Sequence, residues 1–245
     1  MSGHSHWAGI KHRKGINDAK RAKIFTKYAK LLSIAARGGA DPSTNFKLRL
    51  AIDAARSVNM PKENIERAIK AGAGEKNGAA AAEEVVYEAY LPVRQMDGFG
   101  QVAFIIEAAT DNKNRTVGEI KTIFSKNGGK VVPSGSVSFL FTYAGIIAFA
   151  IERYSVDALE EMAIESGADD FRVEDDLFLV ITKPEKLQSV RTFFETKNIL
   201  PESAELGYIP TQTISLSGED LMRYENITGL LEDNIDIQTV WNNVH

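Results

Sequence analysis

Residues 85–129 read VVYEAYLPVRQMDGFGQVAFIIEAATDNKNRTVGEIKTIFSKNGG, and this segment indicates the fold class. Two runs within it, 85–91 and 102–109, are rich in the β-branched, aromatic and other apolar residues that are typical of strands. Residues 92–100, which include proline and glycine, are expected to form the loop between them. The segment therefore predicts a β-hairpin.

A helix is expected directly after this hairpin. Thr116 and Glu119 have the spacing of a capping box at its start, and Gly128 and Gly129 would end it. The order strand–strand–helix begins again at Val137. Strands and helices in mixed order, with hairpins, favour an α+β fold in layers over a doubly wound parallel sheet.

The same patterns predict the elements that follow. Strands are expected at 137–143 and 146–153, hinged at 144–145, and at 171–174, 177–182, 204–209, 211–216 and 236–241. Helices are expected at 156–166, 184–197 and 218–231. The final strand–helix–strand could complete either of two α+β sandwich domains, and periodicity leaves that choice open.

The chain before residue 72 has a helical period instead. A first helix is expected from residue 17 or 18, with Ile24, Tyr28 and Leu31 on one face, and a second follows residues 41–42. A third runs from Pro61 to Gly72. Because three short amphipathic helices can bury one another, we expect a small helical domain, preceded by a basic arm and followed by a Gly/Ala-rich linker at 72–82.

The distribution of charge points to function. The net charge is −4, but residues 1–76 hold 16 Lys and Arg against 6 Asp and Glu, and the remainder holds 13 against 27. Such asymmetry is typical of a polyanion-binding module attached to an acidic body. The alternative is that the lysines form ordinary solvated helix faces. We favour the first interpretation, because an acidic body would repel nucleic acid anywhere else.

The candidate nucleic-acid contacts lie in this basic part. Eight cations are expected to contact phosphates, and they are Lys11, Arg13, Lys14, Lys20, Arg21, Lys23, Lys27 and Lys30. Trp7 could stack on a base or pin the arm to the body, and His12 could add hydrogen bonds. Lys113 and Arg115 form a secondary patch, with a structural role as the alternative. Reversing Lys20, Lys23 and Lys27 to Glu is expected to abolish binding without changing thermal unfolding.

No enzymatic constellation is recognisable in the sequence. There is no phosphate loop, nucleotide fingerprint or nucleophile elbow, and the chain has no cysteine. His4, His6 and His12 could hold a metal, but a mobile arm lacks the side chains that orient ligands. We therefore expect no catalytic residues, no metal site and no cofactor. The longest uncharged stretch, 133–151, is interrupted by glycines and is expected to be a buried hairpin instead of a membrane helix.

Several long motifs resemble the YebC/PmpR family. They are HSHW at 4–7, IKHRK at 10–14, DAKRAKIFTK at 18–27, NMPKENIERAI at 59–69, TDNKNRT at 110–116, KNGG at 126–129, GSV at 135–137 and PTQT at 210–213. The resemblance implies three domains, the third inserted into the second. The expected boundaries are 1–78 for the arm and helical domain, 79–134 with 210–245 for the discontinuous α+β domain, and 135–209 for the inserted one.

The resemblance also implies a function. Proteins of this family are commonly described as probable DNA-binding transcriptional regulators, and related members are translational activators that associate with the ribosome. We therefore expect a cytoplasmic, monomeric, non-enzymatic regulator whose partner is DNA or ribosomal RNA. The helix from Pro61 has charges of mixed sign and lacks the character of a recognition helix, which favours RNA, whereas the family description favours DNA.

Overall fold

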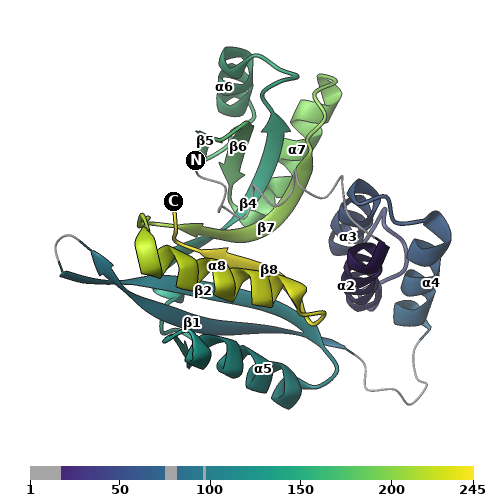
Figure 1. Ribbon diagram of the computed structural model, residues 1–245. Helices are drawn as coiled ribbons and strands as arrows, with labels where there is room; N and C mark the ends of the chain where they lie inside the picture. The colour runs from purple at the N-terminus through teal and green to yellow at the C-terminus, as the bar shows by residue number, and fades with distance from the viewer. Residues whose placement is uncertain (1–17, 75–81, 96–97) are drawn as a thin grey trace.

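The computed structural model describes residues 18–74, 82–95 and 98–245, which form a helical unit and two α+β units (Figure 1). The helical unit contains α2 (Asp18–Ala36), α3 (Phe46–Ser57) and α4 (Lys62–Ala73), as the sequence predicts. Its core includes Leu32, Leu48, Ile52 and Ile65. No helix of the described residues is long and apolar enough to cross a membrane.

The first α+β unit is a four-stranded antiparallel sheet with two helices on one face. Its strands are β1 (Glu83–Gln95), β2 (Gly98–Thr110), β3 (Lys130–Val132) and β8 (Ile237–Asn242), in the spatial order β3-β1-β2-β8. The helices are α5 (Lys113–Lys126) and α8 (Gly218–Asp233). Phe104 of β2 contacts Phe124 of α5 and Tyr224 of α8, so both helices share one core with the sheet.

The second α+β unit lies between β3 and β8 in the sequence. Its elements are β4 (Phe141–Ala150), α6 (Val156–Glu165), β5 (Asp170–Glu174), β6 (Leu177–Thr182), α7 (Leu187–Thr196) and β7 (Ser203–Pro210). The spatial order β5-β6-β4-β7 is that of a ferredoxin-like βαββαβ unit. This connectivity confirms the expected insertion of one α+β unit into the other.

The two sheets pack against each other. Alternate residues of β4 face opposite ways, so Ile146 lies with Ile105 of β2 and Trp241 of β8, whereas Ile147 lies under α6 and α7. The Trp241 ring covers Gly207 of β7, where an added Cβ would lie 2.2 Å from the ring. The resulting layers are α5 and α8, the first sheet, the second sheet, and α6 and α7.

A buried glutamate fixes the crossing from one sheet to the other. The Glu88 carboxylate on β1 accepts backbone N–H groups from Gly135, Val137 and Ser138 at 2.7, 2.7 and 3.1 Å. Burial alone would raise the pKa of Glu88, but these hydrogen bonds outweigh it and lower the pKa. The segment before β4 is therefore held to the first sheet by a charged group whose role the sequence does not reveal.

Some predicted elements are wrong. Strands at 137–143 and 146–153 do not form a hairpin, because β4 is one strand, preceded by a 3-10 turn at Ser138–Leu140. Gly145 is not at a hinge but at a close contact, since an added Cβ would lie 2.9 Å from Leu187. The second unit consequently begins strand–helix–strand. The expected strand at 211–216 is reduced to a bridge between Ile214 and Val244.

Two local predictions around the first hairpin are also corrected. The hairpin strands extend further than expected, with Val93 still paired to Gly100, so the predicted loop 92–100 is mostly strand. The helix α5 is capped by Asn112, whose side chain accepts the Arg115 N–H at 3.0 Å. The predicted capping residue Thr116 is inside the helix, where its hydroxyl has other partners described below.

Gly72 gives a test of the helical unit. In α4 its Cα faces the backbone of α2, and an added Cβ would lie 2.0 Å from the Ser33 carbonyl oxygen. We expect Gly72→Ala to lower the free energy of unfolding by about 1–3 kcal/mol, because backbone would have to move. Gly118→Ala, in α5 with nothing within 4 Å, is the control and should stabilise slightly. Denaturant unfolding measures both, and equal effects would contradict the packing argument.

Candidate nucleic-acid interface

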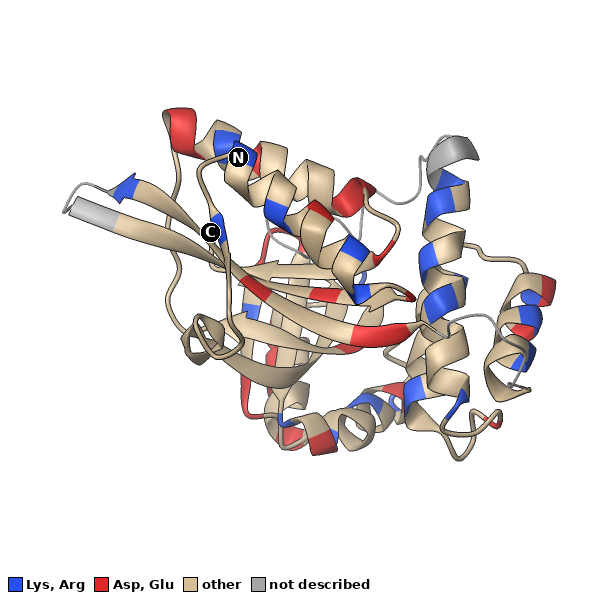
Figure 2. Cartoon of the chain, turned by 90° about the horizontal axis from the view of Figure 1, so that it is seen from below, with Lys and Arg blue, Asp and Glu red and all other residues tan. Residues whose placement is uncertain are grey.

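The predicted phosphate contacts divide between described and undescribed residues. Trp7, Lys11, His12, Arg13 and Lys14 lie outside the described residues. Lys20 is on the first turn of α2, and Arg21, Lys23, Lys27 and Lys30 follow it along the helix. Basic residues are visible along α2 in Figure 2. Because successive helical residues are about 100° apart, those at 20, 23, 27 and 30 lie on one side of α2.

This side of α2 faces another part of the same chain. The turn from the end of α8 to β8, residues 232–236, reads EDNID and is called here the acidic corner. Lys23 Nζ lies 3.2 Å from Asp233 Oδ1, and Lys27 Nζ donates to the Glu232 carbonyl oxygen at 2.6 Å. Lysines are favourable there because the last carbonyl groups of a helix carry partial negative charge.

The contacts of Lys23 and Lys27 argue against one expectation about stability. As phosphate contacts, these lysines are expected to tolerate reversal to Glu with nearly unchanged thermal unfolding. In the structure a Glu at position 23 would face Asp233, and a Glu at position 27 would face the Glu232 carbonyl oxygen. Like charges at such distances repel, so charge reversal would disturb the contact between α2 and the acidic corner.

Asp236 is at the centre of the contact between α2 and the acidic corner. Its carboxylate is buried, with 1% of the side chain exposed, and it pairs with Lys30 of α2. Arg115 Nη2 donates to it at 2.8 Å and Thr116 Oγ1 at 2.9 Å, both from α5, and Thr110 Oγ1 lies 3.2 Å away. Burial alone would raise the pKa of Asp236, but these hydrogen bonds and the charge of Lys30 lower the pKa to about 2.

The secondary patch takes part in ion pairs. Lys113 Nζ lies 2.6 Å from Glu83 Oε2, and Arg115 Nη2 lies 2.8 Å from Asp111 Oδ1 as well as from Asp236. The hydrogen bonds to Asp236 and Asp111 raise the pKa of Arg115, so its charge is permanent. Arg115 therefore has a structural contact, which is the alternative that the sequence left open.

Sequence reasoning missed Asp236. It is the first residue of an expected strand and resembles any exposed residue at a strand end, while its partners Lys30, Thr110, Arg115 and Thr116 are more than a hundred positions away. The TDNKNRT motif at 110–116 contains three of those four partners. It is the one feature of the sequence that points to this site.

Exposed cations remain on the helical unit. Arg37 and Lys70 are exposed and have no ion-pair partner among the described residues. Lys62 lies 3.7 Å from Glu66, and Arg67 donates to the Asn64 side chain, both across the surface of α4. Exposed pairs of this kind are worth about 0–1 kcal/mol, so they leave a cation available to a phosphate.

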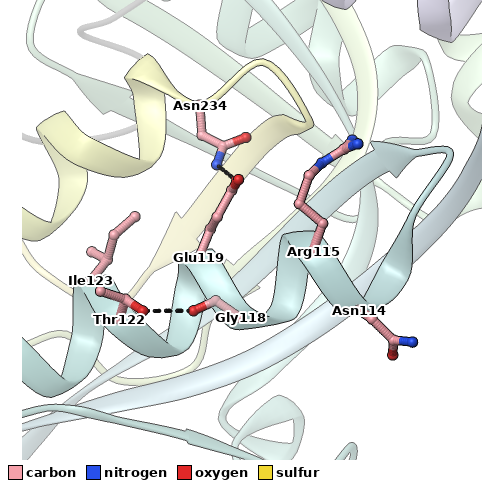
Figure 3. A pocket seen from close by; sticks show the side chains of 7 residues that line it. All are labelled: Asn114, Arg115, Gly118, Glu119, Thr122, Ile123 and Asn234. Atoms are coloured by element: carbon pink, nitrogen blue, oxygen red, sulfur yellow. Dashed lines mark hydrogen bonds between the residues drawn. The ribbon is translucent and has the colours of Figure 1, made fainter.

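A depression lies between α5 and the end of α8 (Figure 3). It has a volume of about 660 Å³. Asn234 donates to Glu119 at 2.7 Å, and Thr122 donates to the Gly118 carbonyl oxygen at 2.8 Å, so these polar groups already have partners. Among the described residues no three His, Cys, Asp or Glu side chains are grouped to hold a metal ion. The basic side of α2 remains the candidate interface.

The fold and the site together define a class of protein: a basic three-helix unit docked on two stacked α+β units. A family model described as the TACO1/YebC protein N-terminal domain matches residues 5–75, and one described as the TACO1/YebC second and third domain matches residues 82–244. The chain belongs to the TACO1/YebC family.

Relatives cover the whole chain. Probable transcriptional regulatory proteins of Caldanaerobacter subterraneus subsp. tengcongensis and Thermoanaerobacter pseudethanolicus are each 46% identical, over 100% of this chain and 98% and 97% of theirs. The crystal structure of a conserved hypothetical protein from Aquifex aeolicus is similar with a TM-score of 0.86 and 40% identity, covering 98% of this chain and 97% of that one.

The buried carboxylate gives a prediction for stability. Asp236→Asn should lower the free energy of unfolding by about 3 kcal/mol, because Lys30 and Arg115 lose their buried counter-charge. Asp111→Asn removes an exposed partner of the same Arg115 and should cost under about 1 kcal/mol. Urea unfolding of both variants at neutral pH measures the difference. Equal losses would contradict a special role for Asp236.

The lowered pKa of Asp236 predicts that the effect of Asp236→Asn on stability depends on pH. The folded-state pKa of Asp236 is lowered from 3.8 to about 2, so its stabilising contribution is complete above the unfolded value and is lost as pH falls. The gap in unfolding free energy between the unmodified protein and Asp236→Asn should therefore close between about pH 4 and pH 2. Urea titrations across this range test it, and a gap that persists at the acid end would refute the assignment.

Proposed function

We propose that this protein is a non-enzymatic regulator of gene expression that binds nucleic acid through the basic side of α2 and the residues preceding it. The observation that carries the proposal is the charge of the first 76 residues, 16 basic against 6 acidic, on a body of opposite sign. Cations next to phosphates release condensed counterions, which favours binding without reading sequence. The acidic body directs the polyanion to the helical unit.

The relatives support a role in transcription. Both bacterial relatives described above are named probable transcriptional regulatory proteins. We propose the same role here, with DNA as the partner. Phosphate contacts would come from Arg21, Lys23 and Lys27, together with Lys20 and the undescribed Lys11, Arg13 and Lys14. Lys30, which the sequence also predicts as a phosphate contact, is paired instead with the buried carboxylate of Asp236. Trp7 and His12 would add stacking and hydrogen bonds.

One observation favours ribosomal RNA as a second candidate partner. A duplex reader usually places a helix with several base-reading side chains in the major groove. The exposed residues of α4 include Lys62, Glu63, Glu66, Arg67 and Lys70, a mixture of signs on a helix of 12 residues. Such a helix suits backbone contacts better than readout of bases, as in recognition of a folded RNA by shape. In that case the protein would act on translation at the ribosome.

Neutral substitutions test the interface without the repulsion that Glu would introduce. The triple variant Lys20→Gln, Lys23→Gln and Lys27→Gln should bind a labelled DNA duplex and a labelled RNA stem–loop more weakly. The slope of log affinity against log salt should fall by roughly 2 to 3, since three phosphate contacts are lost. The matched control carries Lys183→Gln, Lys186→Gln and Lys197→Gln in the second α+β unit. Equal behaviour of the two variants in fluorescence anisotropy would remove α2 from the interface.

Cosedimentation with purified ribosomes separates the two partners. The protein is pelleted across a salt series, with excess duplex DNA as competitor at equal phosphate. Pelleting that falls with salt but survives the DNA would establish the ribosomal candidate. Absence from the pellet, or complete displacement by DNA, would leave transcription as the role.

A further inference from the structure

The acidic corner presents negative oxygens to Lys23 and Lys27, which the proposed function assigns to phosphates, and to Lys30 on the same side of α2. Three of its five residues are acidic, and it also offers the final carbonyl groups of α8. Lys23 pairs with the Asp233 carboxylate, and Lys27 and Lys30 donate to the carbonyl oxygens of Glu232 and Ile235. Each of these successive lysines on one side of α2 therefore has an oxygen of the corner opposite it. A nucleic-acid backbone would offer the same groups a similar row of oxygens.

We infer that the acidic corner is an internal competitor of nucleic acid: it occupies the basic side of α2 in the free protein and is displaced when a nucleic-acid backbone binds. The inference rests on the proposed function. It adds regulation to that function, because affinity then depends on residues at the end of α8 and in the turn after it, which do not contact the nucleic acid. A polyanion must replace the contacts of Lys23 and Lys27 with the corner before it gains contacts of its own.

The contacts between α2 and the acidic corner become more buried from Lys23 to Lys30, so α2 can be released from the corner at one end only. Lys23 and Asp233 are 47% and 65% exposed, whereas Lys30 and Asp236 are 20% and 1% exposed. Solvent and salt weaken the first pair and reach the second far less. Displacement therefore begins at Lys23, the end nearer the N-terminus, while the buried pair of Lys30 and Asp236 stays closed.

The other contacts of the helical unit allow this. Phe46 and Leu50 of α3 pack against the core of the second α+β unit, and Arg191 Nη2 of α7 lies 2.7 Å from Asp53 Oδ2 of α3. These contacts lie on a different helix from the lysines. They hold the helical unit in place, so exposure of the basic side of α2 does not require the unit to detach.

Asp233→Asn tests the inference. The change removes the charge opposite Lys23 and keeps the size of the side chain, so a labelled DNA duplex and a labelled RNA stem–loop should bind roughly two- to fivefold tighter at low salt. The gain should shrink as salt screens the exposed pair. Glu161→Gln, an exposed position on α6, makes the same change in net charge far from α2 and is the control. Fluorescence anisotropy measures the affinities.

A double-mutant cycle assigns the effect to the pair. If Asp233 acts by occupying Lys23, the substitution Asp233→Asn should have little effect on binding in a Lys23→Gln background. An equal gain in both backgrounds, or an equal gain from Glu161→Gln, would show a general effect of net charge and overturn the competition. Unchanged affinity of Asp233→Asn, with strong binding by the unmodified protein, would overturn the inference and leave the proposed function standing. No binding by any variant at low salt would refute the proposed function itself.

Discussion

The buried carboxylate of Asp236 is the constraint on which the arrangement of the units depends. A charge removed from water is stable only where partners replace its hydration, and here they come from α2, β2 and α5. Lys30 is the partner supplied by the helical unit, so the satisfied carboxylate also sets where α2 lies on the first sheet. The adjacent contacts of Lys23 and Lys27 follow from that placement, because they are on the same side of the helix. One buried group thus decides which face of the basic helix meets the acidic body.

Much of the fold could be predicted from the sequence where the determinants are local. The three N-terminal helices follow from apolar periodicity, and the first hairpin follows from its β-rich runs. The predictions failed where one residue type has two possible structural roles, as glycine and threonine do. The sequence predicts a hinge at Gly145, which instead permits the close approach of Leu187, and a helix cap at Thr116, whose hydroxyl instead donates to Asp236. Neither distinction can be made without knowing which distant element lies opposite. The insertion of one unit into the other came from family resemblance, since periodicity does not choose between sheets.

The positive charge of the candidate interface could be predicted from the sequence, but its contacts with the acidic corner could not. Eight cations in a short segment predict a polyanion-binding surface, and the lysines at 20, 23, 27 and 30 predict which side of the helix forms it. The intrachain partners of Lys23, Lys27 and Lys30 are 205 to 210 residues away in the sequence, and no local sequence pattern indicates them. The same holds for Arg115, whose neighbour Asp111 is visible at helical spacing while its buried partner Asp236 is not. Ion pairs between residues that are far apart in the sequence become visible only in the structure, because they depend on distance in space and not on sequence spacing.

The opposite charges of the basic N-terminal segment and the acidic body therefore act together, because the two parts are in contact. An isolated basic helix would bind any polyanion, limited only by salt. Placed against the acidic corner, the same helix would, under the proposed function, bind only partners that outcompete Asp233 and the carbonyl groups at the end of α8. A partner that contacts a single lysine would gain little, whereas one that contacts several lysines at once would replace every displaced contact. The acidic corner would thereby favour extended, correctly spaced phosphates over dispersed anions, which is a form of selectivity that needs no contact with a base.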